Sequence, residues 1–425
     1  MNYEEALEYI HNIKWRVMKV GLSRTRTLLA ALGNPEKQLK FVHVAGTNGK
    51  GSTSAYIANV LRKAGYKTGL FISPYIIRFN ERMQVDGEYI SDDELVQLTE
   101  EIRPLADAMT ETPSEFEIVT AIGMRYFQRK KCDIVVLEVG LGGEFDSTNV
   151  IDTPEVAVIT AIGFDHMKEL GDSITDIAGA KAGIIKSDGD VIIYGGEPEV
   201  EDVFERKCAD AGARLCRADH TRVADIRYAL EGITFRIEPY GDVTTPLLGV
   251  YQPKNVTVAI TTLEILRKKG YNISDEDIKQ GIAGVRWPGR FEVLGRKPFF
   301  ILDGSHNPQG VEATAASLRS YFSDKKIVFV VGVMADKDVD SMIGYIAPIA
   351  SSFVAVKPDY YRAMDAAELA GRLAVYDIPV YTGDTVESGV AQAVDLAGED
   401  GVVCAIGSLY FSANIRDAYL SKNSG

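Results

Sequence analysis

Cysteine is scarce in this chain, and its placement argues against a disulfide framework or a cysteine metal centre. The 425 residues include four cysteines, Cys132, Cys208, Cys216 and Cys404, and none has a partner at metal-ligand spacing. Cys132 and Cys404 lie at or within apolar runs typical of strands. The pattern predicts reduced, mostly buried thiols and therefore a cytoplasmic protein.

A secretory signal and a membrane span are also missing from the sequence pattern. Residues 2–7 indicate the start of a capped amphipathic helix, whereas a signal peptide needs basic and then apolar residues. The uncharged stretch from Ser341 to Val356 is too short and too polar to cross a bilayer. We therefore expect no membrane partner.

Basic residues are outnumbered, with 46 Lys and Arg against 60 Asp and Glu and a net charge of −14. This balance argues against a general nucleic-acid or anionic-membrane surface, so local basic groups must hold any anionic ligand. The chain is longer than one core usually supports, and its 46% hydrophobic residues suffice for two. Two domains are expected.

Glycine is concentrated in the run Ala45–Thr53 (AGTNGKGST), which follows a strand-like segment, Phe41–Val44, and precedes a helical one, Tyr56–Lys63. Glycines let backbone N–H groups converge on an anion, a helix N-terminus adds a favourable dipole, and Lys50 adds positive charge. The run predicts a site for a nucleoside triphosphate.

The run departs from the standard P-loop pattern at two places. Val44 stands where that pattern has its first glycine, and Gly51 displaces Ser52 by one position. A glycine-rich turn with an incidental lysine is the alternative that the run alone leaves open.

Strand-like and helical segments alternate along the chain, which predicts an α/β fold with parallel sheets. Two helices are expected from Ser91 to Met109 and from Ser114 to Arg129, and a hairpin from Ala224 to Val243. The expected N-terminal strands are Phe41–Ala45, Thr68–Ile72, Asp133–Val139, Val156–Ala161 and Val191–Tyr194. The expected C-terminal strands are Phe299–Leu302, Ile327–Val331, Phe353–Val356 and Val402–Ile406. A linker at Leu294–Pro298 gives predicted domains of residues 1–295 and 299–425.

Three further residues are candidates for chemistry at strand ends. Glu138 closes an apolar strand beside glycines, where P-loop enzymes commonly hold Mg²⁺. His166 follows the next strand, and Lys181 lies in a helical segment. From the residues alone, a solvated acid, a structural histidine and a solvated lysine remain open.

The motifs together resemble the folylpolyglutamate synthase and dihydrofolate synthase family, a branch of the Mur ligase superfamily. The matching segments run in order along almost the whole chain: Gly46–Ser52, Ser73-Pro74, Arg78–Arg82, Glu138–Gly143, Asp146–Asn149, Asp165-His166, Lys181–Lys186, Trp287–Arg290, Asp303–Pro308 and Asp336–Asp338.

This resemblance implies an N-terminal P-loop ATPase-like Mur ligase central domain and a C-terminal Rossmann-like domain, with ATP, folate and glutamate meeting in a cleft between them. It also implies a ligase that activates a folate carboxylate as an acyl phosphate and joins it to glutamate's amine. We expect a monomer that extends (tetrahydro)folate. Dihydrofolate synthase activity on dihydropteroate, alone or in addition, is the nearest alternative.

Site residues are also implied by the resemblance. Expected catalytic residues are Lys50, His166, Lys181 and His306. Expected ATP contacts are Thr47, Asn48, Gly49, Lys50, Gly51, Ser52, Asn255, Arg290 and Asp303. Expected ligands of one or two Mg²⁺ ions are Ser73, Glu138, His166 and a carbamylated Lys181. Expected folate contacts are Arg82 and Phe116, although burial of Phe116 in the helix core is equally compatible.

Two departures from common family patterns concern the substrate pocket, because Tyr75 and Tyr251 stand where many members have histidine. Other classes also remain open. A peptidoglycan-precursor ligase would share the loop, Glu138, His166 and Lys181, but its usual extra N-terminal domain has no room before residue 46. A nucleotide-dependent binding switch is disfavoured by the Lys181 and Asp303–Pro308 motifs.

Overall fold

The computed structural model of the protein describes residues 1–12 and 21–423. Its contacts divide the chain into two compact units. Unit 1 comprises Met1–Val223, Glu238–Tyr240 and Lys254–Val285, and unit 2 comprises Ala224–Ile237, Gly241–Pro253 and Arg286–Gly425. A division by contacts does not show which segments fold independently. The domains of residues 1–295 and 299–425 therefore stay a prediction.

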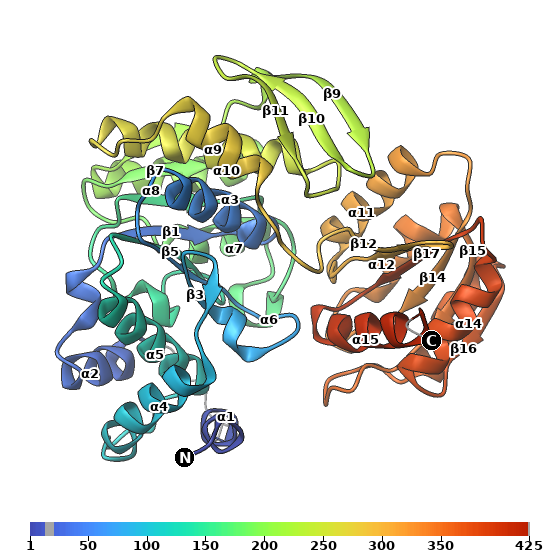
Figure 1. Ribbon diagram of the computed structural model, residues 1–425, viewed down its shortest axis with the longest axis horizontal. Coiled ribbons are helices and arrows are strands. Elements are labelled where there is room, and N and C mark those ends of the chain that lie inside the picture. The colour runs from blue at the N-terminus through green and yellow to red at the C-terminus, as the bar shows by residue number, and fades with distance from the viewer. Residues whose placement is uncertain (13–20, 424–425) are drawn as a thin grey trace. The chain divides into compact units, whose positions relative to one another are not determined.

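Unit 1 is built on an eight-stranded sheet in the order β4-β3-β2-β5-β1-β6-β7-β8 (Figure 1). Its strands are β1 (Phe41–Ala45), β2 (Thr68–Phe71), β3 (Met83–Val85), β4 (Glu88–Tyr89), β5 (Ile134–Glu138), β6 (Val156–Ile159), β7 (Asp190–Ile193) and β8 (Arg214–Arg217). The pairs from β2 through β8 are parallel, and β3 and β4 are added antiparallel. The five expected strands are confirmed, and β3, β4 and β8 were missed because they are short or exposed.

Helices cover both faces of this sheet, which is why β1 and β5 are apolar along their length. Phe41 and Ala45 of β1 point to the same side and pack in the clusters that contain α5 (Glu115–Lys130) and α7 (Ile174–Ala182). Figure 1 shows α3 (Lys50–Lys63), α9 (Gln252–Lys268) and α10 (Asp275–Ala283) together on the other side. The remaining helices are α1 (Tyr3–Asn12), α2 (Ser23–Ala31), α4 (Asp92–Asp107), α6 (Met167–Leu170) and α8 (Pro198–Ala211).

Capping residues begin the two predicted helices α4 and α5. The Ser91 side chain accepts the N–H of Glu94 at 3.2 Å. Ser114 and Glu117 form a reciprocal capping box, with Ser114 N–H donating to Glu117 at 2.6 Å. Both helix starts are confirmed.

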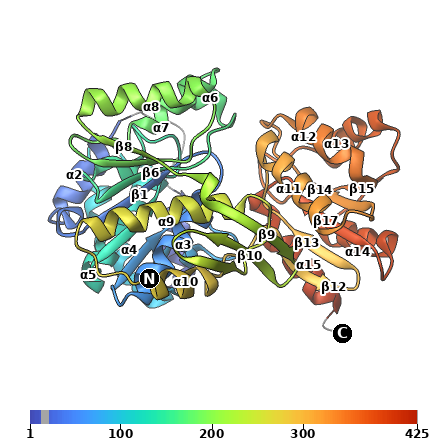
Figure 2. The same cartoon turned by 90° about the horizontal axis from the view of Figure 1, so that it is seen from above.

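Unit 2 contains a six-stranded sheet in the order β12-β13-β17-β14-β15-β16 and a separate three-stranded antiparallel sheet. The strands are β9 (Val223–Ala229), β10 (Gly232–Ile237), β11 (Gly241–Thr245), β12 (Glu292–Arg296), β13 (Phe299–Leu302), β14 (Ile327–Val331), β15 (Ala350–Ala355), β16 (Val380–Thr382) and β17 (Val402–Ile406). Figure 2 shows α11 (Pro308–Tyr321), α12 (Val339–Ile346) and α13 (Ala366–Leu373) on one side of the larger sheet and α14 (Val386–Ala397) and α15 (Ser412–Asn423) on the other.

The four expected C-terminal strands are confirmed as β13, β14, β15 and β17, and the predicted hairpin is confirmed as β9 and β10 with β11 added. The predicted linker at Leu294–Pro298 is wrong. Residues 292–296 form β12, which pairs antiparallel with β13 across a register shift between Val293 and Gly295. The glycine and charges that indicated a linker belong to an exposed edge strand and the turn after it. Within the described residues, no helix is long and apolar enough to cross a membrane.

Candidate functional site

The glycine-rich loop lies between β1 and α3, where backbone crowding explains two of its glycines. Gly46 and Gly49 have φ of 147° and 89°, conformations that favour glycine. A Cβ on Gly46 would lie 1.9 Å from the Oγ1 of Thr160, and one on Gly49 would lie 2.7 Å from the Oδ1 of Asn255. The structure therefore places Asn255 directly against the loop, although it is far away in sequence.

The loop is anchored to the segment that follows β6. The N–H groups of Thr47 and Asn48 both donate to the carbonyl of Ala161, at 2.9 and 3.1 Å. The Oγ1 of Thr47 also donates to the Gly163 carbonyl at 3.0 Å. The N–H groups of Thr47 and Asn48, which were predicted to bind phosphate, thus hold the loop in shape. Residues Lys50–Ser52 form the first turn of α3, where backbone N–H groups have no acceptor within the helix.

Two lysines converge on one carbonyl oxygen of the loop. The Nζ of Lys50 donates to Gly46 O at 3.1 Å, and the Nζ of Lys181, on α7, donates to the same oxygen at 2.9 Å. Lys181 is only 5% exposed. Its burial, and then the positive charge of Lys50, lower the pKa of Lys181 to about 7. Lys181 therefore has a substantial uncharged fraction at neutral pH.

Ser73 and Glu138 follow the neighbouring strands β2 and β5. Glu138 ends β5 beside Val44 and is buried. The Oγ of Ser73 accepts a hydrogen bond from Arg82 Nη1 at 3.1 Å. Because β2, β5 and β1 are adjacent and parallel, their carboxyl ends place Ser73, Glu138 and the loop in this order along one edge of the sheet.

The chemistry of these donors fits Mg²⁺, because carboxylate and hydroxyl oxygens are hard ligands. His166 is placed less tightly. Its two ring nitrogens lie 3.9 Å from the carboxylates of Asp165 and Glu169, and 36% of its side chain is exposed. Among the described residues, no three His, Cys, Asp or Glu side chains are grouped to hold a metal. A metal here would need Ser73, a substrate phosphate or a modified Lys181 to complete its ligands.

Phe116 and Arg82 flank this edge from different elements. Phe116, at the start of α5, packs against the segment after β5, because a Cβ on Gly140 would lie 2.6 Å from its ring. Its ring centroid is 6.1 Å from that of Phe71. The guanidinium of Arg82 lies 5.2 Å from the ring centroid of Tyr75. Aromatic rings and a guanidinium therefore lie beside this edge of the sheet.

Three expected site residues lie close together in unit 2: Arg290 just before β12, and Asp303 and His306 just after β13. Asp303 is almost fully buried and accepts bonds from the N–H of Phe291 at 2.7 Å and of Ser305 at 2.9 Å. A Cβ on Gly304 would lie 2.7 Å from Arg290 Nη1. His306 Nδ1 is 2.9 Å from the Gly304 carbonyl. The Asp303 carboxylate thus fixes the backbone that carries Arg290 and His306.

The chain is similar to known proteins along almost its whole length. The Mur ligase middle domain matches residues 44–263, and the Mur ligase glutamate ligase domain matches residues 289–409. A Bacillus subtilis protein named dihydrofolate synthase/folylpolyglutamate synthase is 38% identical, covering 97% of this chain and 98% of the relative. The chain belongs to the folylpolyglutamate synthase and dihydrofolate synthase family.

Further members of the folylpolyglutamate synthase family match over their full length. Folylpolyglutamate synthase of Lacticaseibacillus casei is 36% identical, with 100% of both chains covered. The structure of Mycobacterium tuberculosis folylpolyglutamate synthase complexed with ADP superimposes with a TM-score of 0.91 at 30% identity, covering 98% of each chain. The α/β architecture with its two Mur ligase domains is therefore that of the family.

A chain of buried polar groups in this synthase-family protein was not evident from its sequence. Asp146 accepts the N–H of Leu141 at 2.9 Å and that of Thr148 at 3.0 Å, so it holds the segment after Glu138. Thr148 Oγ1 is 2.9 Å from Nε2 of His43. Burial raises the pKa of Asp146 and lowers that of His43 to about 3. Asp146 was noted only as part of a motif, and nothing local marked His43, which sits inside an apolar strand.

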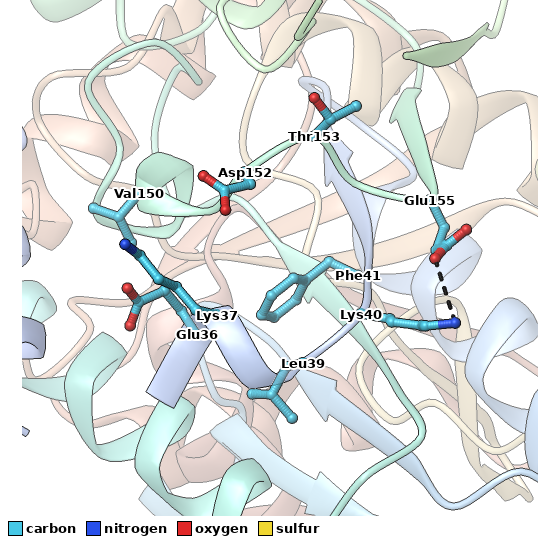
Figure 3. A pocket seen from close by; sticks show the side chains of 9 residues that line it. All are labelled: Glu36, Lys37, Leu39, Lys40, Phe41, Val150, Asp152, Thr153 and Glu155. Carbon is cyan, nitrogen blue, oxygen red and sulfur yellow. Dashed lines mark ion pairs between the residues drawn. The ribbon is translucent and has the colours of Figure 1, made fainter. Parts of the chain in front are cut away.

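A cavity of about 100 Å³ in unit 1 of this synthase-family chain lies away from the loop (Figure 3). It opens at the amino ends of β1 and β6, where Lys40 and Glu155 face each other at 3.9 Å. Ligands of parallel sheets gather at the carboxyl ends of strands. The cavity is therefore not part of the candidate site.

Proposed function

We propose that this chain is a folylpolyglutamate synthase, which adds L-glutamate to the γ-carboxylate of (tetrahydro)folate at the expense of ATP. The observation that carries the proposal is the pair Lys50 and Lys181 on the Gly46 carbonyl, within a chain that matches folylpolyglutamate synthases from end to end. Dihydrofolate synthase activity is the second candidate, because the Bacillus subtilis relative bears both names.

The proposed reaction proceeds in two balanced steps. An oxygen of the folate carboxylate attacks the γ-phosphorus of ATP, so the bond to ADP breaks and an acyl phosphate forms. The amine of glutamate then attacks the acyl carbon and loses a proton, phosphate leaves, and an amide remains. Because all reactants are anionic, Lys50 and the N-terminus of α3 would offset their repulsion and orient the phosphates.

Mg²⁺ would supply further charge neutralisation at the phosphates when it is bound. We propose Ser73 and Glu138 as ligands of one ion, with His166 and a carbamylated Lys181 contributing to a second. The buried carboxylate of Glu138 and the hydroxyl of Ser73, both hard oxygen donors, support the first assignment.

Carbamylation of Lys181 is supported by its environment. CO₂ adds to an uncharged amine, and burial next to Lys50 lowers the pKa of Lys181 to about 7, which provides that form near neutral pH. The carbamate would be an anion, and the ammonium of Lys50 at the same carbonyl would stabilise it. Carbamylation would thus change the Lys181 side chain from a cation into an anion that could bind a metal.

The other assignments follow the placement of the residues. We propose that Asn255, Arg290 and Asp303 help to bind ATP, with Asp303 acting through the backbone it fixes. His306 would lie near glutamate or the transferred phosphate, and Arg82 and Phe116 would contact the folate. We also propose a cytoplasmic monomer, a location consistent with four free cysteines.

The test is incubation of the purified protein with ATP, Mg²⁺ and glutamate, with either tetrahydrofolate or dihydropteroate, followed by phosphate release and product mass. We expect a glutamate adduct of tetrahydrofolate. An adduct of dihydropteroate as well would establish the bifunctional enzyme. An adduct of dihydropteroate alone would replace the first assignment by dihydrofolate synthase, and no adduct from either acceptor would refute both.

A further inference from the structure

Four loops of unit 2 meet at the carboxyl edge of its larger sheet. The loops after β14 and β15 are joined by a bridge between Met334 and Ala363, and Ala335 N–H donates to the Arg362 carbonyl at 2.9 Å. Gly407, after β17, donates to the carbonyl of Ser305, after β13, at 3.0 Å. Since β13, β17, β14 and β15 are neighbours, these loops form one connected surface next to His306.

Arg362 lies on an aromatic platform in this surface. The rings of Tyr360 and Tyr410 stack at 4.4 Å with an angle of 15° between them. The guanidinium carbon of Arg362 is 5.4 Å from the Tyr360 centroid and 5.9 Å from that of Tyr410. The two rings thus lie within cation–π distance of the guanidinium.

The protein leaves hydrogen-bonding capacity on Arg362. Its Nη1 reaches the Asp336 carboxylate only at 3.5 Å, its side chain also hydrogen-bonds to Tyr360, and its Nε is buried without an acceptor among the described residues. About a third of the side chain, 34%, is exposed. By contrast, the guanidinium of Arg214 makes a two-pronged pair with Asp190 at 2.7 and 2.8 Å. Arg362 thus lacks the geometry of a finished structural ion pair.

A planar guanidinium with spare donors matches a carboxylate, which it can bind through two parallel hydrogen bonds. The substrates in the proposed reaction carry such groups: free glutamate has two, and a polyglutamylated folate has several along its tail. In a chain with a net charge of −14, they need a local cation.

We propose that Arg362, supported by Tyr360 and Tyr410, binds a carboxylate of the glutamyl substrates, either of incoming glutamate or of the γ-glutamyl tail of the folate. The inference rests on the proposed function. Arg362 binds and orients, and takes no part in the bond-making steps.

The test compares Arg362→Lys and Arg362→Ala with Arg372→Lys. Arg372, on α13, also makes only long contacts, at 3.4 Å, with Asp340 and Glu368, so it controls for the loss of a surface guanidinium in the same unit. KM is measured for glutamate, for ATP, and for tetrahydrofolate with one and with three glutamates. Tyr410→Leu tests the platform with Arg362 intact.

We expect one KM to rise roughly 10- to 100-fold in Arg362→Ala, the range for losing a charged hydrogen-bond pair, with a smaller rise in Arg362→Lys and Tyr410→Leu. A rise in KM for glutamate assigns the incoming amino acid, and a rise confined to the three-glutamate folate assigns the tail. The KM for ATP and all values for Arg372→Lys stay within about twofold of wild type.

Folded Arg362 variants with wild-type KM values would overturn the proposal. So would a fall in kcat with no selective change in KM, because it would indicate a structural role. The melting temperature of each variant shows whether it is folded. Failure of the proposed function is separate, since the wild-type protein would then form no glutamate adduct at all.

Discussion

The carbonyl oxygen of Gly46 brings two residues of the candidate site together. Two lysine amines donate to it, and two ammonium groups so close together repel each other. Lys181 is the more buried, so it is the one that gives up its proton more easily. Burial and the neighbouring charge therefore favour the uncharged amine, which is the form that the proposed carbamate requires.

Replacing Lys181 by alanine should abolish turnover while largely preserving the fold, because its proposed role is to hold a metal. We expect kcat to fall by a factor on the order of 10³ or more, in line with loss of a positioned charge at a reacting phosphate. Partial rescue by a short carboxylic acid would support the carbamate. Full activity of the alanine variant, measured as phosphate release with tetrahydrofolate, would contradict it.

His43 should make stability depend on pH in the acid range. Its pKa is about 3 in the folded protein and about 6.5 when exposed, so between these values the unfolded chain binds more protons. The free energy of unfolding should therefore rise with pH through this window, by up to about 1.4 kcal/mol per pH unit from this residue. The raised pKa of Asp146 acts in the opposite sense.

The contribution of His43 is isolated by comparing wild type with His43→Gln in urea unfolding between about pH 4 and pH 7. Glutamine retains a group that can pair with Thr148 but does not titrate. We expect a shallower dependence on pH for the variant. Identical slopes for the two proteins would show that His43 is not held uncharged.

At the scale of elements, the loop between β1 and α3 is crowded by residues of two other parts of unit 1. Thr160 follows β6, and Asn255 lies on α9, and each occupies the space that a side chain on the loop would need. The loop conformation is thus imposed from outside as well as allowed by its own glycines.

Gly49→Ala should weaken nucleotide binding at least roughly tenfold, because a methyl group would meet Asn255 and φ would be strained. Gly179→Ala is the matched control. Gly179 lies in α7 with nothing within 4 Å of the added carbon, so that change should leave binding intact and stabilise the helix by about 0.5–1 kcal/mol. Calorimetric titration with ADP and thermal unfolding distinguish the two. Equal affinities would refute the crowding argument.

At the scale of the whole molecule, each contact-defined unit is made of three separate segments of the chain. Unit 1 takes α9 and α10 after the chain has already supplied β9–β11 to unit 2. The last segment of unit 2 starts at Arg286, before the predicted domain start at residue 299. It includes β12, an edge strand of the larger sheet, and the buried Phe291. Where a fragment is cut should therefore matter.

A fragment of residues 286–425 should be more stable than one of residues 299–425. The shorter fragment loses β12 and the buried Phe291, whose burial alone contributes about 1.5–3 kcal/mol. Far-ultraviolet circular dichroism and urea unfolding of the two fragments provide the measurement. A shorter fragment that is equally stable would support residues 299–425 as a self-sufficient domain.

The sequence predicts those features that depend on local order. The glycine run, the serine caps and the buried strands each lie within a few residues, so their patterns are visible before folding. His43 and Arg362 illustrate the remainder. His43 matters through Thr148, and Arg362 through Tyr410, partners that only the sheet order brings near. Likewise β12 was read as a linker, because an exposed edge strand has a linker's composition.

The contact between Gly49 and Asn255 also has a consequence for how the protein is made. A ribosome synthesises the loop early and Asn255 much later, after the segment that joins unit 2. Such a long-range contact is costly to close while the chain is still growing. We expect nascent chains that stop before α9 to bind nucleotide poorly, so the growing polypeptide gains its ATP site only when most of unit 1 has left the ribosome.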